Sequence, residues 1–137
     1  MACFMEGVAW FTHKYVMHGF LWILHEDHHR YTGHRFEKND LFAIFFSAIA
    51  ILLFLAGSLT GTFYFTSMAI GVTLYGIGYV LFHDIMFHRR IKSIPLKPTT
   101  PYLKRIVNAH SVHHQRNTKN KDKAYGFLYA SAKYNVD

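Results

Sequence analysis

Ten of the eleven histidines in this chain of 137 residues fall into two copies of one spacing pattern. Each copy consists of an HxxxxH pair followed by an HxxHH triplet. The first copy supplies His13, His18, His25, His28 and His29, and the second supplies His83, His88, His110, His113 and His114. Only His34 lies outside the pattern. Histidine is the commonest metal ligand in proteins, and four clusters of two alternating types predict a metal site, which a single HxxxxH pair would not.

The spacing within each cluster sets which imidazoles meet. On an α-helix, positions i, i+3 and i+4 fall within about 100° of arc, so each HxxHH triplet presents three imidazoles on one face. The two members of an HxxxxH pair are separated by about 140° on the same helix. Such a pair reaches one metal only if the helix is locally widened; otherwise its members serve different metals. The sequence leaves both arrangements open.

Ten imidazoles exceed the ligands that one ion takes, because a structural zinc is bound by four. They divide naturally between two ions, with four or five ligands each. Imidazole suits zinc, copper, iron and nickel, so the ligand type does not identify the metal. Three acidic residues next to predicted ligands are expected either to accept imidazole N–H groups or to lie on a solvated face. These are Glu26, Asp27 and Asp84.

The element that separates the two copies is a stretch from 41 to 82 without Asp, Glu, Lys, Arg or His. As one straight helix it would be about 63 Å long, twice the thickness of a bilayer core. Residues 57–62 hold two glycines and three hydroxyl side chains, which predicts a turn there. We therefore expect a transmembrane hairpin with spans at 41–59 and 63–82. A buried hairpin in a soluble protein is disfavoured, because the remaining chain is too short to cover two helices that are apolar all round.

Composition and charge exclude several other classes. Hydrophobic residues make up 51% of the chain, which excludes a disordered protein. The single cysteine, Cys3, excludes an internal disulfide framework and a cysteine-rich zinc or iron–sulfur site. The net charge is +7, and ten Lys and Arg residues lie between positions 89 and 123. The positive-inside rule places the histidine side in the cytoplasm or an equivalent compartment such as a plastid stroma. A nucleic-acid role is disfavoured because this basic face meets the membrane.

The segments outside the hairpin are predicted as further helices and loops. Residues 1–24 form a weaker apolar helix, which either lies at the membrane interface or is the end of a longer membrane helix. Three prolines predict a loop around 95–101, followed by a helix at 102–114 and a polar loop at 117–123. The aromatic residues of 124–134 are expected to return that segment to the membrane surface. The whole chain, 1–137, is thus predicted to be one all-α domain, an integral membrane helical bundle with a cytoplasm-side histidine-rich di-metal site.

Four stretches of the sequence carry a resemblance to a known family. They are MEGVAW at 5–10 leading into HKYVMHG at 13–19, the pair His28–His29 followed by GHRFEKND at 33–40, YVLFHDIMFHRR at 79–90, and NAHSVHH at 108–114 with GFL at 126–128. This pattern resembles the membrane fatty-acid hydroxylase and sterol desaturase superfamily, and more narrowly its carotenoid hydroxylases. Family members usually have a longer apolar lead before the first histidine pair, so the resemblance implies that the first membrane helix is shortened here.

The resemblance implies a reaction and its cofactors. The superfamily holds two non-haem iron ions with histidines on the cytoplasmic side of a small helical bundle. The carotenoid branch hydroxylates β-carotene at carbons 3 and 3′ of its rings, giving β-cryptoxanthin and then zeaxanthin. The reaction uses O₂ and two electrons, supplied by reduced ferredoxin or a similar carrier. The residues themselves support this class of reaction, because oxygen insertion into an unactivated C–H bond needs a redox metal, which zinc is not.

Other side chains are candidates for binding the substrate and the electron carrier. A hydrophobic substrate dissolved in the bilayer would enter through a greasy channel, for which the candidates are Phe20, Trp22, Tyr75, Tyr79 and Phe82. Lipid-facing or bundle packing is the alternative for each of them. An acidic carrier would dock on basic residues near the site, unless these only orient the protein in the membrane. The basic candidates are Arg89, Arg90, Lys104 and Arg105.

Three alternatives to a carotenoid hydroxylase remain. A fatty acid or sterol hydroxylase or desaturase of the same superfamily would have the same ligands. A bis-histidine haem protein would need a histidine pair on facing helices within the membrane, and residues 41–82 contain no histidine. A metal transporter or sensor would need charged or ligating groups near the middle of the membrane, where this chain has none. A visible spectrum separates haem from the other two.

Overall fold

The computed structural model describes residues 2–30, 34, 36–115 and 124–136, and in these ranges all regular structure is helical. The predicted polar loop at 117–123 lies outside the described residues. The elements are α1 (Ala2–Phe11), η1 (Thr12–Phe20), α2 (Trp22–His29), α3 (Asp40–Thr60), α4 (Phe63–Tyr79), η2 (Val80–Phe87), α5 (Pro101–His114) and η3 (Ala132–Tyr134). Of these, η1 and η2 are π-helical and η3 is a 3₁₀ turn. The prediction of an all-α protein is confirmed.

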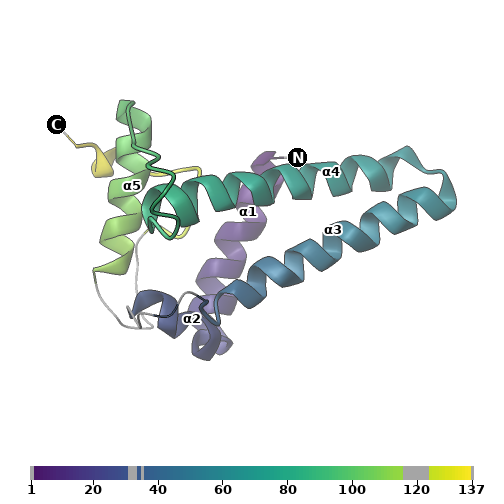
Figure 1. The fold of residues 1–137 in the computed structure, drawn as a ribbon, viewed down its shortest axis with the longest axis horizontal. Helices are drawn as coiled ribbons and strands as arrows, with labels where there is room; N and C mark the ends of the chain where they lie inside the picture. The colour runs from purple at the N-terminus through teal and green to yellow at the C-terminus, as the bar shows by residue number, and fades with distance from the viewer. Residues whose placement is uncertain (1, 31–33, 35, 116–123, 137) are drawn as a thin grey trace.

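Helices α3 and α4 run side by side as a long hairpin, as predicted (Figure 1). The turn is shorter than expected, because α3 continues through Gly57 and ends only at Thr60. Gly61 then adopts a left-handed conformation (φ 65°), which favours glycine, and α4 begins at Phe63. A side chain at Gly57 would overlap the hydroxyl group of Thr66, so glycine here lets the two helices approach closely.

The outer surface of the hairpin is almost entirely apolar and uncovered. Segments 40–60 and 63–87 are each long enough to cross a bilayer, and only 17% and 11% of their most apolar windows are buried. Large side chains such as Leu52, Leu59 and Phe63 are 64%, 88% and 77% exposed. The core helix of a soluble protein would be mostly buried, so this exposure favours a lipid-facing hairpin.

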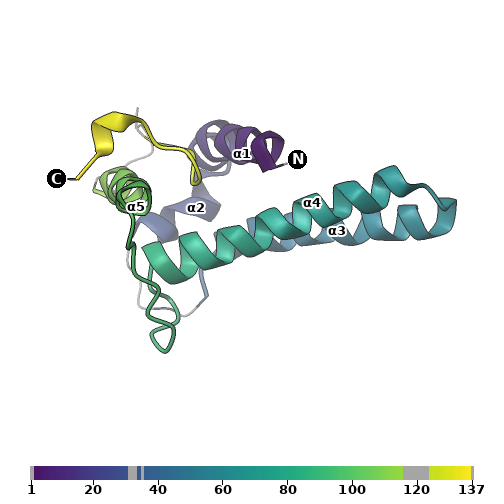
Figure 2. The ribbon, with the colours of Figure 1, turned by 90° about the horizontal axis from the view of Figure 1, so that it is seen from above.

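The other helices gather at the open end of the hairpin, away from its turn (Figures 1 and 2). One small core joins η2, α5 and the C-terminal segment, and it contains Met86, Ile106, Ala109, Ala130 and Tyr134. A second core joins α1 to the hairpin through Met5, Ala50 and Val72. Among the described residues the most completely buried large side chains belong to neither core but are two histidines, His25 and His113. The interior at this end is therefore polar.

The C-terminal segment differs from its prediction. Tyr125, Phe127 and Tyr134 are buried, and only Tyr129 is exposed, so the segment does not lie with its aromatic side chains on the membrane surface. It is held against the bundle by polar contacts, among them the bond from the Asn108 amide to the Tyr134 carbonyl (3.0 Å). These contacts link segments distant in the sequence, which is why a local aromatic pattern did not reveal them.

Candidate metal centre

Both HxxxxH pairs fall on π-helical segments: η1 contains His13 and His18, and η2 contains His83 and ends just before His88. A π-helix joins residues five apart by its backbone hydrogen bonds, and the His88 N–H donates to the His83 carbonyl in this way (3.0 Å). The wider turn brings residues i and i+5 to one face, which is the first of the two arrangements that the sequence left open. The ring centroids of His13 and His18 are 5.0 Å apart, and those of His83 and His88 are 4.6 Å apart.

Nine of the described histidines converge into two groups, and within each group the ligand nitrogens lie within 4.8 Å of one another. The first cluster consists of His13, His18, His25, His29 and His113, and the second consists of His28, His88, His110 and His114. Each HxxHH triplet is therefore divided: α2 gives two histidines to the first cluster and one to the second, and α5 does the reverse. The two clusters adjoin, because the rings of His29 and His114 stack at 4.2 Å.

The tenth histidine of the pattern, His83, lies at the edge of the second cluster. Its Nε2 atom is 3.1 Å from Nε2 of His28, and its ring is stacked on that of Tyr79 at 4.3 Å. His34, which lies outside the pattern, is exposed and belongs to neither cluster. The structure thus brings together the ten patterned histidines and leaves the eleventh apart.

The hydrogen bonds of the outer ring nitrogens set which imidazole nitrogen carries the proton. His25 Nδ1 donates to the Asn39 side-chain oxygen (2.7 Å), and His13 Nδ1 donates to the Tyr125 carbonyl (2.9 Å). Both oxygens can only accept, so these nitrogens carry the protons of neutral rings. The inner Nε2 atoms of His13 and His25 therefore present bare lone pairs, and they face each other at 3.1 Å.

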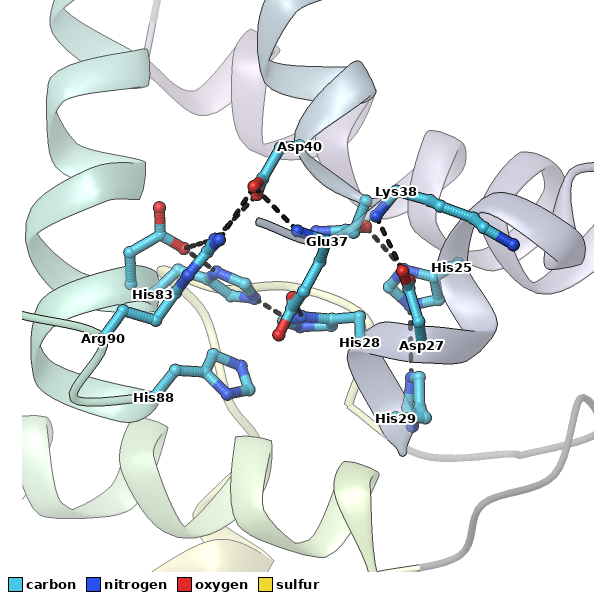
Figure 3. Close-up of polar contacts among 12 residues, drawn as sticks. His25, Asp27, His28, His29, Glu37, Lys38, Asp40, His83, His88 and Arg90 are labelled. Atoms are coloured by element: carbon cyan, nitrogen blue, oxygen red, sulfur yellow. Dashed lines mark hydrogen bonds and ion pairs between the residues drawn. The ribbon is translucent and has the colours of Figure 1, made fainter. Parts of the chain in front are cut away.

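The same arrangement occurs at the second cluster. His28 Nδ1 donates to the Glu37 carboxylate (2.7 Å; Figure 3), and His83 Nδ1 donates to the Asp84 carboxylate (2.9 Å). The Nε2 atoms of His28 and His83 then face each other at 3.1 Å, again lone pair to lone pair. Two acceptors this close repel unless a cation lies between them. The first cluster, and the second cluster together with His83 at its edge, therefore each present a pair of nitrogens arranged for a metal ion.

The distances fit shared coordination. Two imidazole nitrogens, each about 2.1 Å from one ion, would be about 3.0 Å apart at a right angle and about 3.4 Å apart at a tetrahedral angle. His25 Nε2 is 3.1 Å from Nε2 of both His13 and His29, and His18 Nε2 is 3.1 Å from Nε2 of His113. Neutral nitrogen donors at these separations match the ligand set of a transition metal.

Burial keeps these rings neutral. Desolvation, assisted by the neighbouring imidazoles, lowers the pKa well below 6.5 for His13, His25, His28, His29 and His110. The pKa of His88 falls to about 4, chiefly through burial and also through the charge of Arg90. At neutral pH the imidazoles therefore retain the lone pairs that a metal requires.

The acidic residues expected beside the ligands have different partners. Asp84 accepts a hydrogen bond from the His83 ring, which is the first of the two alternatives expected for it, an acceptor of an imidazole N–H group. Glu26 instead pairs with Arg30 on the surface (2.9 Å), and Asp27 accepts from the Lys38 backbone N–H (2.7 Å). Neighbouring positions on α2 are about 100° apart, so Glu26 and Asp27 face away from the clusters although they adjoin ligands in the sequence.

Two partners of the histidine rings, Glu37 and Asn39, were not predicted. Both lie just before α3, within the stretch GHRFEKND at 33–40 that carries part of the family resemblance. Asn39 is 4% exposed. Next to them, Asp40 binds Arg90 through two bonds of 2.7 and 2.8 Å (Figure 3). This pair joins the start of α3 to the segment after η2, and it engages one of the basic residues proposed for the electron carrier.

An apolar cavity of about 570 Å³ reaches the clusters from the hairpin. His13, His25, His83 and His110 line it at one end. Ile51 and Phe54, which are 59% and 40% exposed, line it as well, so the cavity extends to the lipid-facing side.

Two of the five channel candidates, Tyr75 and Tyr79, line this cavity, whereas the other three are not among its lining residues. Trp22 packs on the rings of His18 and His29, with centroids 5.2 and 5.5 Å away. Phe20 is 77% exposed, and Phe82 packs against the core that joins η2 and α5.

The fold and the two clusters define an all-helical membrane protein with a candidate two-metal centre. Residues 1–131 match the fatty acid hydroxylase family, and the chain belongs to that family. Among similar relatives, the beta-carotene hydroxylase of Pseudescherichia vulneris is 41% identical over 126 residues, which cover 92% of this chain and 70% of the relative. That of Pantoea ananas is 42% identical over 128 residues, covering 92% and 71%. The chloroplastic beta-carotene 3-hydroxylase of an Oncidium hybrid cultivar is 38% identical over 115 residues, covering 80% and 37%. No solved structure matches the chain.

Proposed function

We propose that this protein is a membrane di-iron monooxygenase that hydroxylates β-carotene at carbons 3 and 3′, forming β-cryptoxanthin and then zeaxanthin. The observation that carries the proposal is the pair of imidazole clusters, each with facing lone pairs, at the end of an apolar cavity in a lipid-facing hairpin. The relatives that cover most of the chain's length are beta-carotene hydroxylases, and their substrate dissolves in the bilayer.

The proposed ligands are the ten patterned histidines, five in the first cluster and His83 with the four of the second. Iron bound there would supply the activation of O₂ that an unactivated C–H bond requires. In each hydroxylation one oxygen atom enters the C–H bond and the other leaves as water, with two electrons and two protons consumed. The role of the surrounding residues is to hold each ring: Asn39, Glu37, Asp84 and the Tyr125 carbonyl fix the Nδ1 protons and so aim the Nε2 atoms inward.

The cavity is proposed to hold one ring of the carotenoid and the adjoining part of its chain. Its volume lies within the range of small-molecule sites, and its wall is mostly hydrocarbon. Tyr75, Tyr79 and Phe127 form the wall nearest the clusters, with Tyr75 and Tyr79 rings 4.9 and 5.7 Å from that of Phe127. The opening near Ile51 and Phe54 would let the substrate enter from the lipid.

The electrons are proposed to come from a reduced ferredoxin or a similar acidic carrier. Arg89, Lys104 and the surrounding basic residues lie on the histidine side of the hairpin, where an acidic partner would be attracted. By the positive-inside rule, the same charges support the proposal that this side faces the cytoplasm or the plastid stroma. The chain is proposed to act as one membrane domain over 1–137, with 1–24 in the first membrane segment.

The test is pigment analysis in cells that accumulate β-carotene and express this chain, combined with iron analysis of the purified protein. The expected result is β-cryptoxanthin and zeaxanthin, with two iron ions per chain. Unchanged β-carotene together with an iron-loaded protein would reject the carotenoid assignment in favour of a fatty acid or sterol substrate. A haem absorption band in the visible spectrum would reject the di-iron centre.

A further inference from the structure

The Glu6 carboxylate joins the two ends of the chain. Its Oε1 atom accepts hydrogen bonds from three consecutive backbone N–H groups, those of Phe127, Leu128 and Tyr129, each at 3.0 Å. Its Oε2 atom accepts from the Tyr75 hydroxyl at 2.6 Å. One side chain of α1 thus holds the C-terminal segment and α4 together. Among the described residues, no other carboxylate accepts from three backbone amides.

The chain is shaped for this contact. Three consecutive amides directed at one oxygen form a concave anion site, which suits a carboxylate. A Cβ atom at Gly126 would lie 2.6 Å from Glu6 Oε1, so glycine at this position allows the approach. The proposed hydroxylation mechanism uses neither Glu6 nor Gly126.

The segment that Glu6 holds contacts both the metal centre and the cavity. The Tyr125 carbonyl accepts the Nδ1 proton of His13, and the Tyr125 ring packs edge-on against His18 and His113, with centroids 5.3 and 5.4 Å away. Two residues later, Phe127 lines the cavity beside Tyr75. A shift of this segment would therefore turn a ligand ring and move the cavity wall at the same time.

We infer that Glu6 is a positioning residue for the hydroxylation, acting through residues 125–129 to aim His13 and to fix the wall against which the substrate ring rests. The inference deepens the proposed function and rests on it for its kinetic consequence. Glu6 touches neither the metal positions nor the cavity opening, so its influence passes through the segment that it binds and through Tyr75, which lines the cavity.

The first test measures the contact between Glu6 and the C-terminal segment. It uses amide hydrogen exchange at residues 127–129 and iron content, neither of which requires a substrate. Glu6→Ala removes all four hydrogen bonds, and exchange should accelerate at least about tenfold. Glu6→Gln keeps a carbonyl oxygen for the three amides and should retain most of the protection. Gly126→Ala, which forces a methyl group onto Glu6 Oε1, should resemble Glu6→Ala. Gly7→Ala is the matched control, because a Cβ there meets nothing within 4 Å.

The second test separates kcat from KM with β-carotene in detergent micelles. Glu6→Ala should lower kcat about 10- to 100-fold, as loss of support for a ligand does, and should raise KM as the cavity wall moves. Glu6→Gln should recover activity to within about fivefold of the unsubstituted protein. A role confined to general stability would lower the amount of active enzyme and leave KM unchanged.

The inference is overturned if Glu6→Ala leaves exchange at residues 127–129 unchanged, or if exchange rises while iron content, kcat and KM stay the same. If Glu6→Ala does not accumulate, Glu6→Gln and Gly126→Ala answer the same question with smaller changes. If the unsubstituted protein binds iron but does not hydroxylate β-carotene, the proposed function fails. The exchange and iron measurements then still decide whether Glu6 holds the segment that aims His13.

Discussion

The two copies of the histidine pattern reach their clusters by different routes. The first copy lies in one continuous stretch of η1 and α2, from His13 to His29. The second is assembled from η2 and α5, which a loop with no regular helix separates. Each copy nevertheless gives part of its triplet to the other, since His28 joins the second cluster and His113 the first. Each cluster therefore contains histidines from both copies, and neither cluster is complete until both copies are folded.

The clusters also differ in what holds their rings. In the first, the ring protons of His13 and His25 go to neutral oxygens, a carbonyl and an amide. In the second, the ring protons of His28 and of His83 at its edge go to the carboxylates of Glu37 and Asp84. A carboxylate makes the ring a more basic ligand, so the second position should hold the more strongly positive ion or bind its ion more tightly.

Removing a histidine that one copy of the pattern contributes to the other copy's cluster should have the largest effect. His113→Ala deletes a fully buried member of the first cluster that α5 supplies, so hydroxylation should fall more than about 100-fold and bound iron should drop to about one ion per chain. Pigment analysis and iron stoichiometry measure both quantities. Two irons per chain in this variant would show that His113 is not a ligand.

Changing the ring partners should distinguish the clusters. Glu37→Ala should weaken metal binding about 10- to 100-fold at the second cluster, and Asn39→Leu should do the same at the first. Titration of the metal-free protein with Co²⁺, followed by its visible absorption, would show two binding phases. Each variant should shift a different phase, and a shift of the same phase by both would contradict the division into two clusters.

A smaller effect is expected at the Asp40–Arg90 ion pair, which connects α3 to the segment after η2. Arg90→Lys keeps the charge but loses the two-bond contact with Asp40. Because both side chains are partly exposed, the free energy of unfolding should fall by only about 1 kcal/mol. Thermal unfolding in detergent measures this, and metal loading of the first cluster should be unaltered. A loss of iron from both clusters would mean that the Asp40–Arg90 ion pair stabilises both clusters and not only the second copy of the pattern.

The smallest effect is expected at the histidine outside the pattern. His34 is exposed and belongs to neither cluster, so His34→Ala should leave iron content and hydroxylation within about twofold of the unsubstituted protein. This variant is the matched control for His113→Ala. A loss of activity like that of His113→Ala would break the distinction between patterned and unpatterned histidines.

The histidine spacing and the uncharged stretch were sufficient to predict the hairpin and the residues that converge, because both are local patterns with a fixed geometric meaning. The division of His25, His28 and His29 between two clusters was not predictable, since it depends on how α2 meets α5. Glu37 and Asn39 were missed because they act across a turn. Phe20, Trp22 and Phe82 do not line the cavity and stay untested as channel residues, because aromatic character alone does not give the direction of a side chain. The sequence left two arrangements open for the HxxxxH pairs, and only the backbone conformation shows that the helix is widened at both pairs.

The widened turns make the spacing of these pairs sensitive to chain length. A π turn accommodates one more residue than an α turn, so η1 and η2 each contain a surplus position within ordinary helix. Removing one residue between His13 and His18 would let that segment relax to an α-helix and still leave the two rings on one face, four residues apart. The residues beyond the deletion would keep their angular positions about the axis, because the wider turn had absorbed the one residue removed. The same deletion in an ordinary α-helical turn would rotate every later residue by about 100°, so the tolerance to shortening is confined to the two widened pairs.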